Sequence, residues 1–120
     1  MADQKQIIGR VPDKKANAIM HKEYLTLLSR RQNKRKRDLL IDFGTNKDIL
    51  AVAEIVYNLL EGTIPLNVKQ RRTLRHYQNT LRQIARKSCS CKQKREILKQ
   101  DGGFLPTLIP IALSVLSSLL

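Results

Sequence analysis

Apolar residues recur along this chain at three- and four-residue intervals, the spacing that places side chains on one face of a helix. A shorter apolar stretch, "DLLIDFG", ends at Gly44, which suits the position just after a helix C-terminus. The longer pattern before it runs from about Lys15 to Arg31 and contains Ile19, Met20, Tyr24, Leu27 and Leu28. The N-terminal third is therefore predicted to form one amphipathic helix followed by one or two helical turns.

The next segment, from Lys47 to Glu61, has apolar side chains around almost the whole circumference of a helix. A helix of that kind is normally buried. Thr45 or Asn46 can cap its N-terminus, and Asp48 stands three residues after Thr45, as in a capping box. Gly62 would end this helix, so the segment is predicted to be a buried helix with defined ends.

A second strong helical pattern begins at Asn67, which has Gln70 three residues later in a capping arrangement, and it continues to about Lys87. The apolar residues of this helix form a narrow stripe, made of Leu74, Tyr77, Leu81, Ile84 and Ala85. "SCSC" then interrupts the pattern, and "KQKREILKQDGG" predicts a last short basic helix or a frayed turn. No segment alternates in the manner of a β-strand.

The final segment, Phe104 to Leu120, carries no charge. As an ideal helix it would extend about 25 Å, slightly less than the roughly 30 Å hydrocarbon core of a bilayer. Pro106 and Pro110 would shorten or kink that helix further. Its polar residues share one face and predict a weakly amphipathic helix: Thr107, Ser114, Ser117 and Ser118. This tail is interpreted as an interfacial or partner-binding helix, with the last core helix of the domain as the alternative.

The charge of the chain is strongly basic and unevenly distributed. The 120 residues include 23 Lys and Arg against 10 Asp and Glu, a net charge of +13, and residues 62–103 hold 11 of the basic and 2 of the acidic side chains. Such a surface attracts polyanions, of which nucleic acid is a commoner partner than an anionic membrane or an acidic protein. Arginine predominates and its planar fork matches phosphate oxygens. Because no base-reading motif is present, we expect sequence-independent binding, with double-stranded DNA as the partner.

A second basic run, "RRQNKRKR", occupies Arg30 to Arg37 and fits a nuclear-import or phosphate-binding patch, with a solvated helix end as the alternative. The predicted nucleic-acid-binding residues are Arg30, Arg31, Lys34, Arg35, Lys36, Arg37, Lys69, Arg71, Arg72, Arg75, Arg82, Arg86, Lys87, Lys92, Lys94 and Arg95.

Taken together, these patterns predict an all-α fold, a small bundle of three to four helices with a flexible N-terminal arm and a hydrophobic C-terminal helix. The predicted segments are a flexible basic arm at 1–14, an amphipathic helix and basic run at 15–44, a helical nucleic-acid-binding region at 45–101 and the tail at 104–120. The N-terminus has no apolar stretch typical of a signal peptide.

Catalytic and metal-binding residues are not evident. His21 and His76 stand apart from any nucleophile or carboxylate pair, so no enzyme is predicted. Cys89 and Cys91 would supply two zinc ligands where a structural site needs four, so neither a metal nor another cofactor is predicted. Two cysteines also argue against a disulfide-stapled secreted scaffold.

The stretch "GGFLPTLIP", placed after a basic segment, resembles the C-terminal part of the adenoviral minor core protein X (mu) precursor. It is more similar still to the protein X-like products of adintoviruses and Polinton (Maverick) elements. The resemblance covers roughly residues 46–120 and is most specific over 94–110. It implies a virion-core-like protein that condenses or packages viral or transposon DNA, located in the virion and the host nucleus.

The resemblance also implies processing and further partners: other virion proteins, a viral cysteine protease, and a membrane contacted through the tail. The adenoviral protease favours a large apolar or amide residue, any residue, and two glycines before the cut. "QDGGF" fits that pattern at Gln100, Gly102, Gly103 and Phe104, with the cut after Gly103; a plain helix end with a flexible joint is the alternative. The predicted membrane residues are Phe104, Leu105, Leu108, Ile109, Ile111, Leu113, Val115, Leu116, Leu119 and Leu120.

The chain departs from the adenoviral pattern in one respect. The adenoviral core peptide is extremely Arg-rich and largely unstructured, whereas residues 46–87 here contain two apolar patterns that can pack together. This difference favours a folded domain that presents a basic face. The alternative functions are a membrane-disrupting or membrane-anchored cationic peptide precursor and a helix-turn-helix regulator with the tail in its core.

Overall fold

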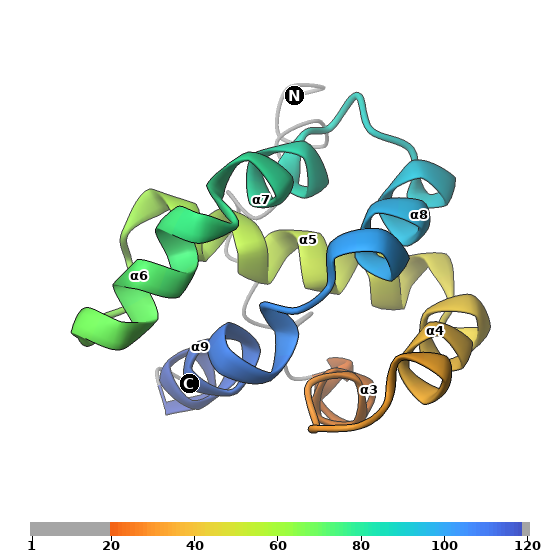
Figure 1. The fold of residues 1–120 in the computed structure, drawn as a ribbon. Helices are drawn as coiled ribbons and strands as arrows, with labels where there is room; N and C mark the ends of the chain where they lie inside the picture. Colours follow the sequence, from red (N-terminus) through yellow and green to blue (C-terminus); the bar gives the residue numbers. More distant parts are fainter. Residues whose placement is uncertain (1–19, 119–120) are drawn as a thin grey trace.

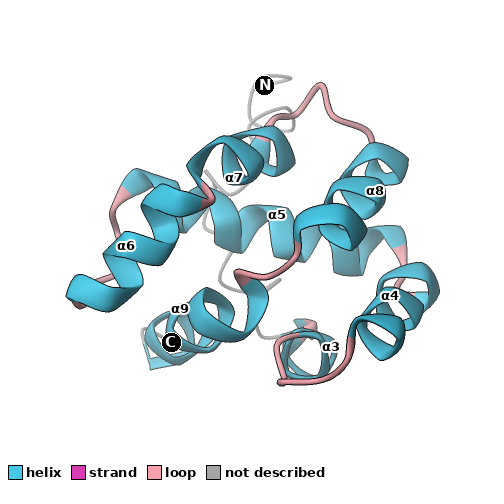
Figure 2. Ribbon diagram, viewed as in Figure 1, coloured by secondary structure: helices cyan, strands magenta, loops and turns pink. Residues whose placement is uncertain are grey.

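The computed structural model describes residues 20–118, and every regular element in that range is a helix (Figure 2). Seven helices are present there: α3 (Lys22–Leu28), α4 (Lys34–Phe43), α5 (Asn46–Glu61), α6 (Val68–His76), α7 (Gln78–Ala85), α8 (Cys91–Asp101) and α9 (Leu105–Ser118). The all-helical class agrees with the sequence, but the predicted bundle of three to four helices is wrong. The predicted arm at 1–14 lies outside the described residues.

Helix α5 runs across the middle of the molecule, with the other helices arranged around it (Figure 1). The predicted capping box is confirmed: the Asp48 backbone N–H donates to Thr45 Oγ1 at 3.1 Å, and the Thr45 N–H donates to Asp48 Oδ2 at 2.9 Å. Gly62 ends the helix with φ of 78°, a left-handed conformation that glycine adopts without a Cβ penalty. Half of the residues of α5 are buried: Ile49, Ala51, Val52, Ala53, Ile55, Val56, Asn58 and Leu59.

Helices α3, α7, α8 and α9 all contact α5, and each contributes apolar residues to one continuous core. Leu25 and Leu28 come from α3, Leu81 and Ile84 from α7, and Leu98 from α8. Because α5 is apolar on nearly every side, no single partner could cover it. Several short helices are therefore needed where the sequence predicted a few longer ones.

The C-terminal segment is part of that core. Its helix α9 lies against α3, α5 and α6. The segment buries Phe104, Leu105, Leu108, Ile109, Ala112, Leu113 and Leu116. In this fold the hydrophobic tail therefore has the position of the last core helix, the alternative to an exposed amphipathic helix. Between residues 20 and 118, none of the helices combines the length and the apolar character needed to cross a bilayer.

Helices α3 and α4 differ in detail from the predicted pattern. Leu25 and Leu28 form the buried face of α3, whereas Met20 and Leu27, assigned to that face from the sequence, are 73% and 42% exposed. Helix α4 begins within the basic run, because the side chain of Asn33 accepts a hydrogen bond from the Lys36 N–H at 2.9 Å. The basic run therefore supplies the first turn of α4, Lys34 to Arg37, which makes the helix four residues longer than the apolar stretch Asp38–Phe43.

The predicted helix at 67–87 is divided at Tyr77, where φ is −99° and ψ is 11°. The capping box of Asn67 and Gln70 is confirmed at its start. The Tyr77 ring packs against Phe104, with the ring centroids 5.7 Å apart. Helix α8, expected as a short helix or a frayed turn, is a complete helix of 11 residues with its own capping box between Ser90 and Gln93.

The glycine pair at the α8–α9 junction lies in a close-packed turn. A Cβ on Gly102, which is buried, would overlap the Leu98 carbonyl oxygen, and a Cβ on Gly103 would overlap the Tyr77 hydroxyl group. Both glycines are therefore required by the close approach of neighbouring atoms. Through this turn the chain passes from α8 to α9, with Gly102 and Phe104 buried and Gly103 exposed.

We predict that Leu108→Ala lowers the free energy of unfolding by about 2–5 kcal/mol, the usual cost of removing a fully buried leucine side chain. Leu108 has no exposed surface, whereas Leu39 on α4 is 49% exposed and provides the matched control. Leu39→Ala should cost much less. Chemical denaturation of both variants measures the difference; equal small losses would contradict a core position for α9.

Candidate nucleic-acid interface

The exposed face of the bent helix formed by α6 and α7 carries a row of basic side chains. We define the cationic stripe as Lys69, Arg71, Arg72, Arg75, Arg82 and Arg86, all of them exposed. Steps of three residues keep Lys69, Arg72 and Arg75 on one side of α6. The opposite side holds the half-buried Leu74 and the buried Leu81. From Lys69 to Arg86 the backbone path of the stripe, followed along both helices through the bend, is about 26 Å at the rise of an α-helix.

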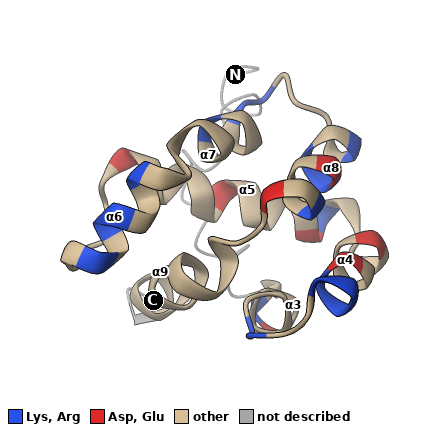
Figure 3. Cartoon of the chain, viewed as in Figure 1, with Lys and Arg blue, Asp and Glu red and all other residues tan. Residues whose placement is uncertain are grey.

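The stripe is not neutralised by ion pairs within the fold. Among the described residues, no salt bridge joins any of its six members, and no carboxylate occurs in the sequence between Gly62 and Arg95. Figure 3 shows α6 bearing Lys and Arg positions without Asp or Glu. Like charges at i,i+3 and i,i+4 repel on a helix, so these arginines reduce the stability of α6 and α7. Phosphate groups would relieve that repulsion.

The stripe continues into an open concavity at the α7–α8 loop. Arg86 and Lys92 line this space of about 840 Å³ together with the hydroxyl groups of Ser88 and Ser90. Glu96 lies on the same lining and is its one acidic residue. Lys87 is also exposed beside it. The predicted residues from 69 to 92 thus form one surface along α6, α7 and the start of α8.

Lys94 and Arg95 were predicted to contact phosphate, and the structure gives both a different role. The Lys94 side chain is fully buried, and its Nζ donates to the carbonyl oxygens of Arg86 and Cys89 at 2.8 Å each. It therefore holds the α7–α8 loop. Arg95 is half-buried and donates to the Ile41 carbonyl at 2.5 Å and to Asn46 Oδ1 at 2.9 Å, which fixes the turn between α4 and α5.

The buried position of Lys94 changes its titration. Removal of the ammonium group from water lowers the pKa of Lys94 below its usual 10.5, and nearby Cys89 and Cys91, as thiolates, oppose that shift. A helical-wheel plot of 91–101 could have revealed this lysine, because Lys94 stands four residues before the buried Leu98, on the same helix face. The overall basic composition of the segment concealed it.

The residues of the basic run lie at the α3–α4 junction. Arg30, Arg31, Arg35 and Lys36 are exposed, and Lys34 is exposed but pairs with Asp38 at 2.6 Å. Arg37 is half-buried, and its Nε is buried without a hydrogen-bond partner in the described part of the chain. This group lies on the α3–α4 linker and the first turn of α4, at a different end of the molecule from α6 (Figure 3). The structure therefore separates the predicted residues into two surfaces.

The residues predicted for processing surround the close-packed glycine turn. Gln100 and Gly103 are exposed, whereas Gly102 and Phe104 are buried. A cut after Gly103 would detach α9 from the rest of the chain, and the core would then depend on a helix that is no longer covalently attached. Of the predicted membrane residues, Ile111 and Val115 are half-buried, the others up to Leu116 are buried, and Leu119 and Leu120 lie outside the described residues.

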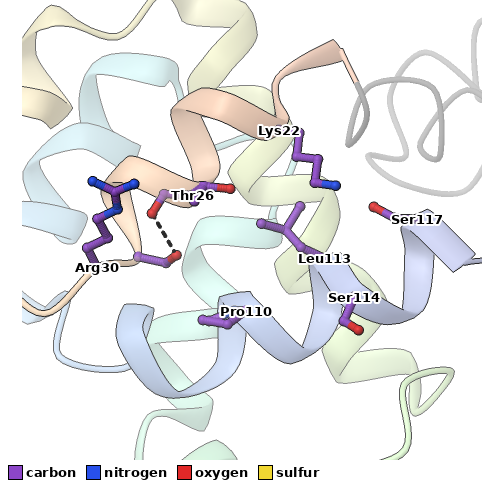
Figure 4. Close-up of a pocket in the computed structure, with 8 residues that line it drawn as sticks. Lys22, Thr26, Arg30, Pro110, Leu113, Ser114 and Ser117 are labelled. Atoms are coloured by element: carbon purple, nitrogen blue, oxygen red, sulfur yellow. Dashed lines mark hydrogen bonds between the residues drawn. The ribbon is translucent and has the colours of Figure 1, made fainter.

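The remaining candidate side chains do not gather into a reactive site. His21 Nδ1 lies 2.6 Å from Asp48 Oδ1 and joins α3 to α5. Cys89 and Cys91 are free thiols, and over residues 20–118 no three His, Cys, Asp or Glu side chains are arranged to hold a metal ion. A groove of about 700 Å³ between α3 and α9 is lined by two cations, Lys22 and Arg30, and by hydroxyl and apolar side chains (Figure 4).

Comparison of the chain with protein-family models, with curated proteins and with solved structures found no match in any of the three.

The buried ammonium group generates a pH-dependent prediction. Because folding lowers the pKa of Lys94, the unfolded chain holds this proton more tightly, and stability rises as the pH increases from the lowered value toward 10.5. The free energy of unfolding of the wild type, minus that of Lys94→Met, should therefore increase between neutral pH and pH 10.5. Urea denaturation across that range measures it.

Lys92→Met is the matched control, since Lys92 is exposed on the same helix. The difference between wild type and Lys92→Met should stay nearly constant over the same pH range. A constant difference for Lys94→Met as well would contradict a desolvated amine at this position.

Proposed function

We propose that this protein is a non-enzymatic, sequence-independent nucleic-acid-binding protein whose cationic stripe contacts the phosphate backbone of double-stranded DNA. The observation that carries the proposal is that the basic residues fall into two groups with different contacts. Lys94, Arg95 and Lys99 bond to groups of the protein itself, whereas the six residues of the stripe are exposed and without salt bridges among the described residues. Cations that reduce the stability of their own helix and have no internal partner are suited to an external anion.

The geometry of the stripe supports contact with several phosphates at once. Its length of about 26 Å covers a stretch of duplex that bears about 15 phosphate charges on its two strands. Arginine guanidinium groups can donate two parallel hydrogen bonds to one phosphate. Asn79 and Gln83 are the exposed amides within the stripe, and either could reach a base edge. Backbone contacts therefore outnumber any base contact, which favours binding without sequence selection over a helix-turn-helix regulator.

The resemblance to protein X-like virion proteins agrees with this proposal in charge and in the order of its segments. We therefore extend the proposal to packaging of viral or transposon DNA in a virion core. The membrane-active alternative receives less support, because the apolar side chains it requires are packed against α3, α5 and α6. An apolar face already covered by the protein has little left to insert into a bilayer.

We predict that the full chain binds random-sequence duplex DNA with an affinity that falls steeply with salt. If all six cations of the stripe contact phosphate, the slope of log K against log [NaCl] is about −5. Arg72→Gln/Arg75→Gln should reduce the steepness by about 2, because each lost contact releases roughly one counterion fewer. Fluorescence anisotropy at several salt concentrations measures both slopes.

Lys22→Gln/Lys47→Gln is the charge-matched control, since both lysines are exposed and lie on α3 and α5, away from the stripe. This control should retain the wild-type slope. Equal losses in the two double variants would argue against the stripe as the binding surface, and a wild type that fails to bind DNA at low salt would refute the function itself.

A further inference from the structure

The basic run at the α3–α4 junction forms a second cationic surface that the stripe does not require. We define the junction surface as Arg30, Arg31, Arg35 and Lys36, all exposed and without a salt bridge to any residue from 20 to 118. Lys34 is excluded because it pairs with Asp38, and Arg37 because it is half-buried near the Gly102 turn. Three of the cations in the run lie in the first turn of α4, where the helix dipole disfavours positive charge.

The junction surface is held in a defined shape by its polar neighbours. Gln32 Nε2 donates to the carbonyl oxygens of Leu27 and Leu28, at 3.0 and 3.3 Å, and so closes the C-terminus of α3. Asn33 caps α4 immediately afterwards. The linker that carries Arg30 and Arg31 is thus hydrogen-bonded at its C-terminal side, beside the first turn that carries Arg35 and Lys36. The four cations are presented together on a fixed piece of backbone.

The two surfaces point to different ends of the molecule. In Figure 3 the blue positions of α6 and those of the α3–α4 junction lie at opposite sides of the ribbon, with the uncharged helix α9 between them. The contacts agree with this arrangement, because α6 packs against α9, whereas α4 packs against α3 and α8. The molecule measures 40 × 32 × 26 Å. The Debye length at physiological salt is about 8 Å, so charges on opposite sides of a molecule of this size are largely screened from each other.

We propose that the junction surface binds a second DNA duplex, so that one protein molecule bridges two duplex segments. This inference rests on the proposed function of the stripe and adds a partner to the other end of the same molecule. Two basic surfaces that face apart can neutralise phosphates on two duplexes while the protein body keeps those duplexes apart and screened from each other. Once one duplex is held, a second segment of the same DNA is bound at a high effective concentration. A monomer with this geometry compacts DNA without self-association.

The test is capture of a second duplex. A short duplex is immobilised on beads and saturated with the protein, unbound protein is washed away, and a fluorescent duplex of unrelated sequence is added. The wild type should capture the second duplex. Arg30→Gln/Arg31→Gln/Arg35→Gln/Lys36→Gln should bind a single duplex in anisotropy within a few-fold of wild type, while second-duplex capture falls at least tenfold.

A charge-conserving variant guards against loss by misfolding. Arg30→Lys/Arg31→Lys/Arg35→Lys removes the guanidinium groups and keeps the charge, so it should retain most of the capture. Circular dichroism and the unfolding midpoint verify that both variants fold. If the glutamine variant does not fold, the wild type is tested at increasing salt instead. Loss of second-duplex capture while the first duplex is still bound then provides the same comparison.

Each other outcome overturns the inference. If the wild type binds one duplex but captures no second one, bridging is refuted and the proposed function stands; if the wild type binds no duplex, the proposed function fails first. Undiminished capture by the glutamine variant would assign bridging to self-association. A last experiment measures binding to phosphatidylcholine vesicles with and without phosphatidylserine. If the glutamine variant loses vesicle binding but keeps second-duplex capture, the junction surface faces a membrane and the inference is overturned.

Discussion

The structure depends on one constraint, the need to remove helix α5 from water on nearly all sides. Its buried residues face several directions, and Ile49, Val52 and Ile55 are almost completely inaccessible. Each large aliphatic side chain buried in this way contributes about 1.5–3 kcal/mol. The surrounding helices must therefore turn their own apolar stripes inward, which leaves their charged faces outward. The basic surface is in this sense a product of the same packing that forms the core.

Packing also explains why the basic residues fall into two groups. A lysine or arginine buried among these helices is stabilised when its donors find oxygen atoms. Lys94 finds two backbone carbonyls and Arg95 finds a carbonyl and an amide oxygen. Buried polar groups that lack such partners cost free energy, so these two side chains become part of the scaffold. The cations that face outward do not need oxygen partners within the protein, because water solvates them. They are also more numerous than solubility requires.

The features that the sequence predicted correctly are local ones. Capping boxes depend on residues three positions apart, and those of Thr45 and Asn67 were readable before any tertiary structure was known. The exposed arginines of α6 could also be predicted, because they lie opposite an apolar stripe on the same helix. The number of helices could not, since the break at Tyr77 depends on where Phe104 packs, and these residues are distant in the sequence. The tail was ambiguous for a related reason: an uncharged helix looks the same whether lipid or protein covers it.

The position of α9 has a consequence for how the chain folds as it is made. Leu105 follows Leu28 by 77 residues, yet α9 lies directly against α3. Closure of a loop that long is costly in entropy and slows folding. Of the described helices α9 is also the last to be synthesised, so α5 stays partly uncovered on the ribosome until α9 has emerged. During that interval the nascent chain carries both an exposed apolar helix and a strongly cationic one, and a polyanion bound early to the cationic helix would keep the incomplete chain soluble.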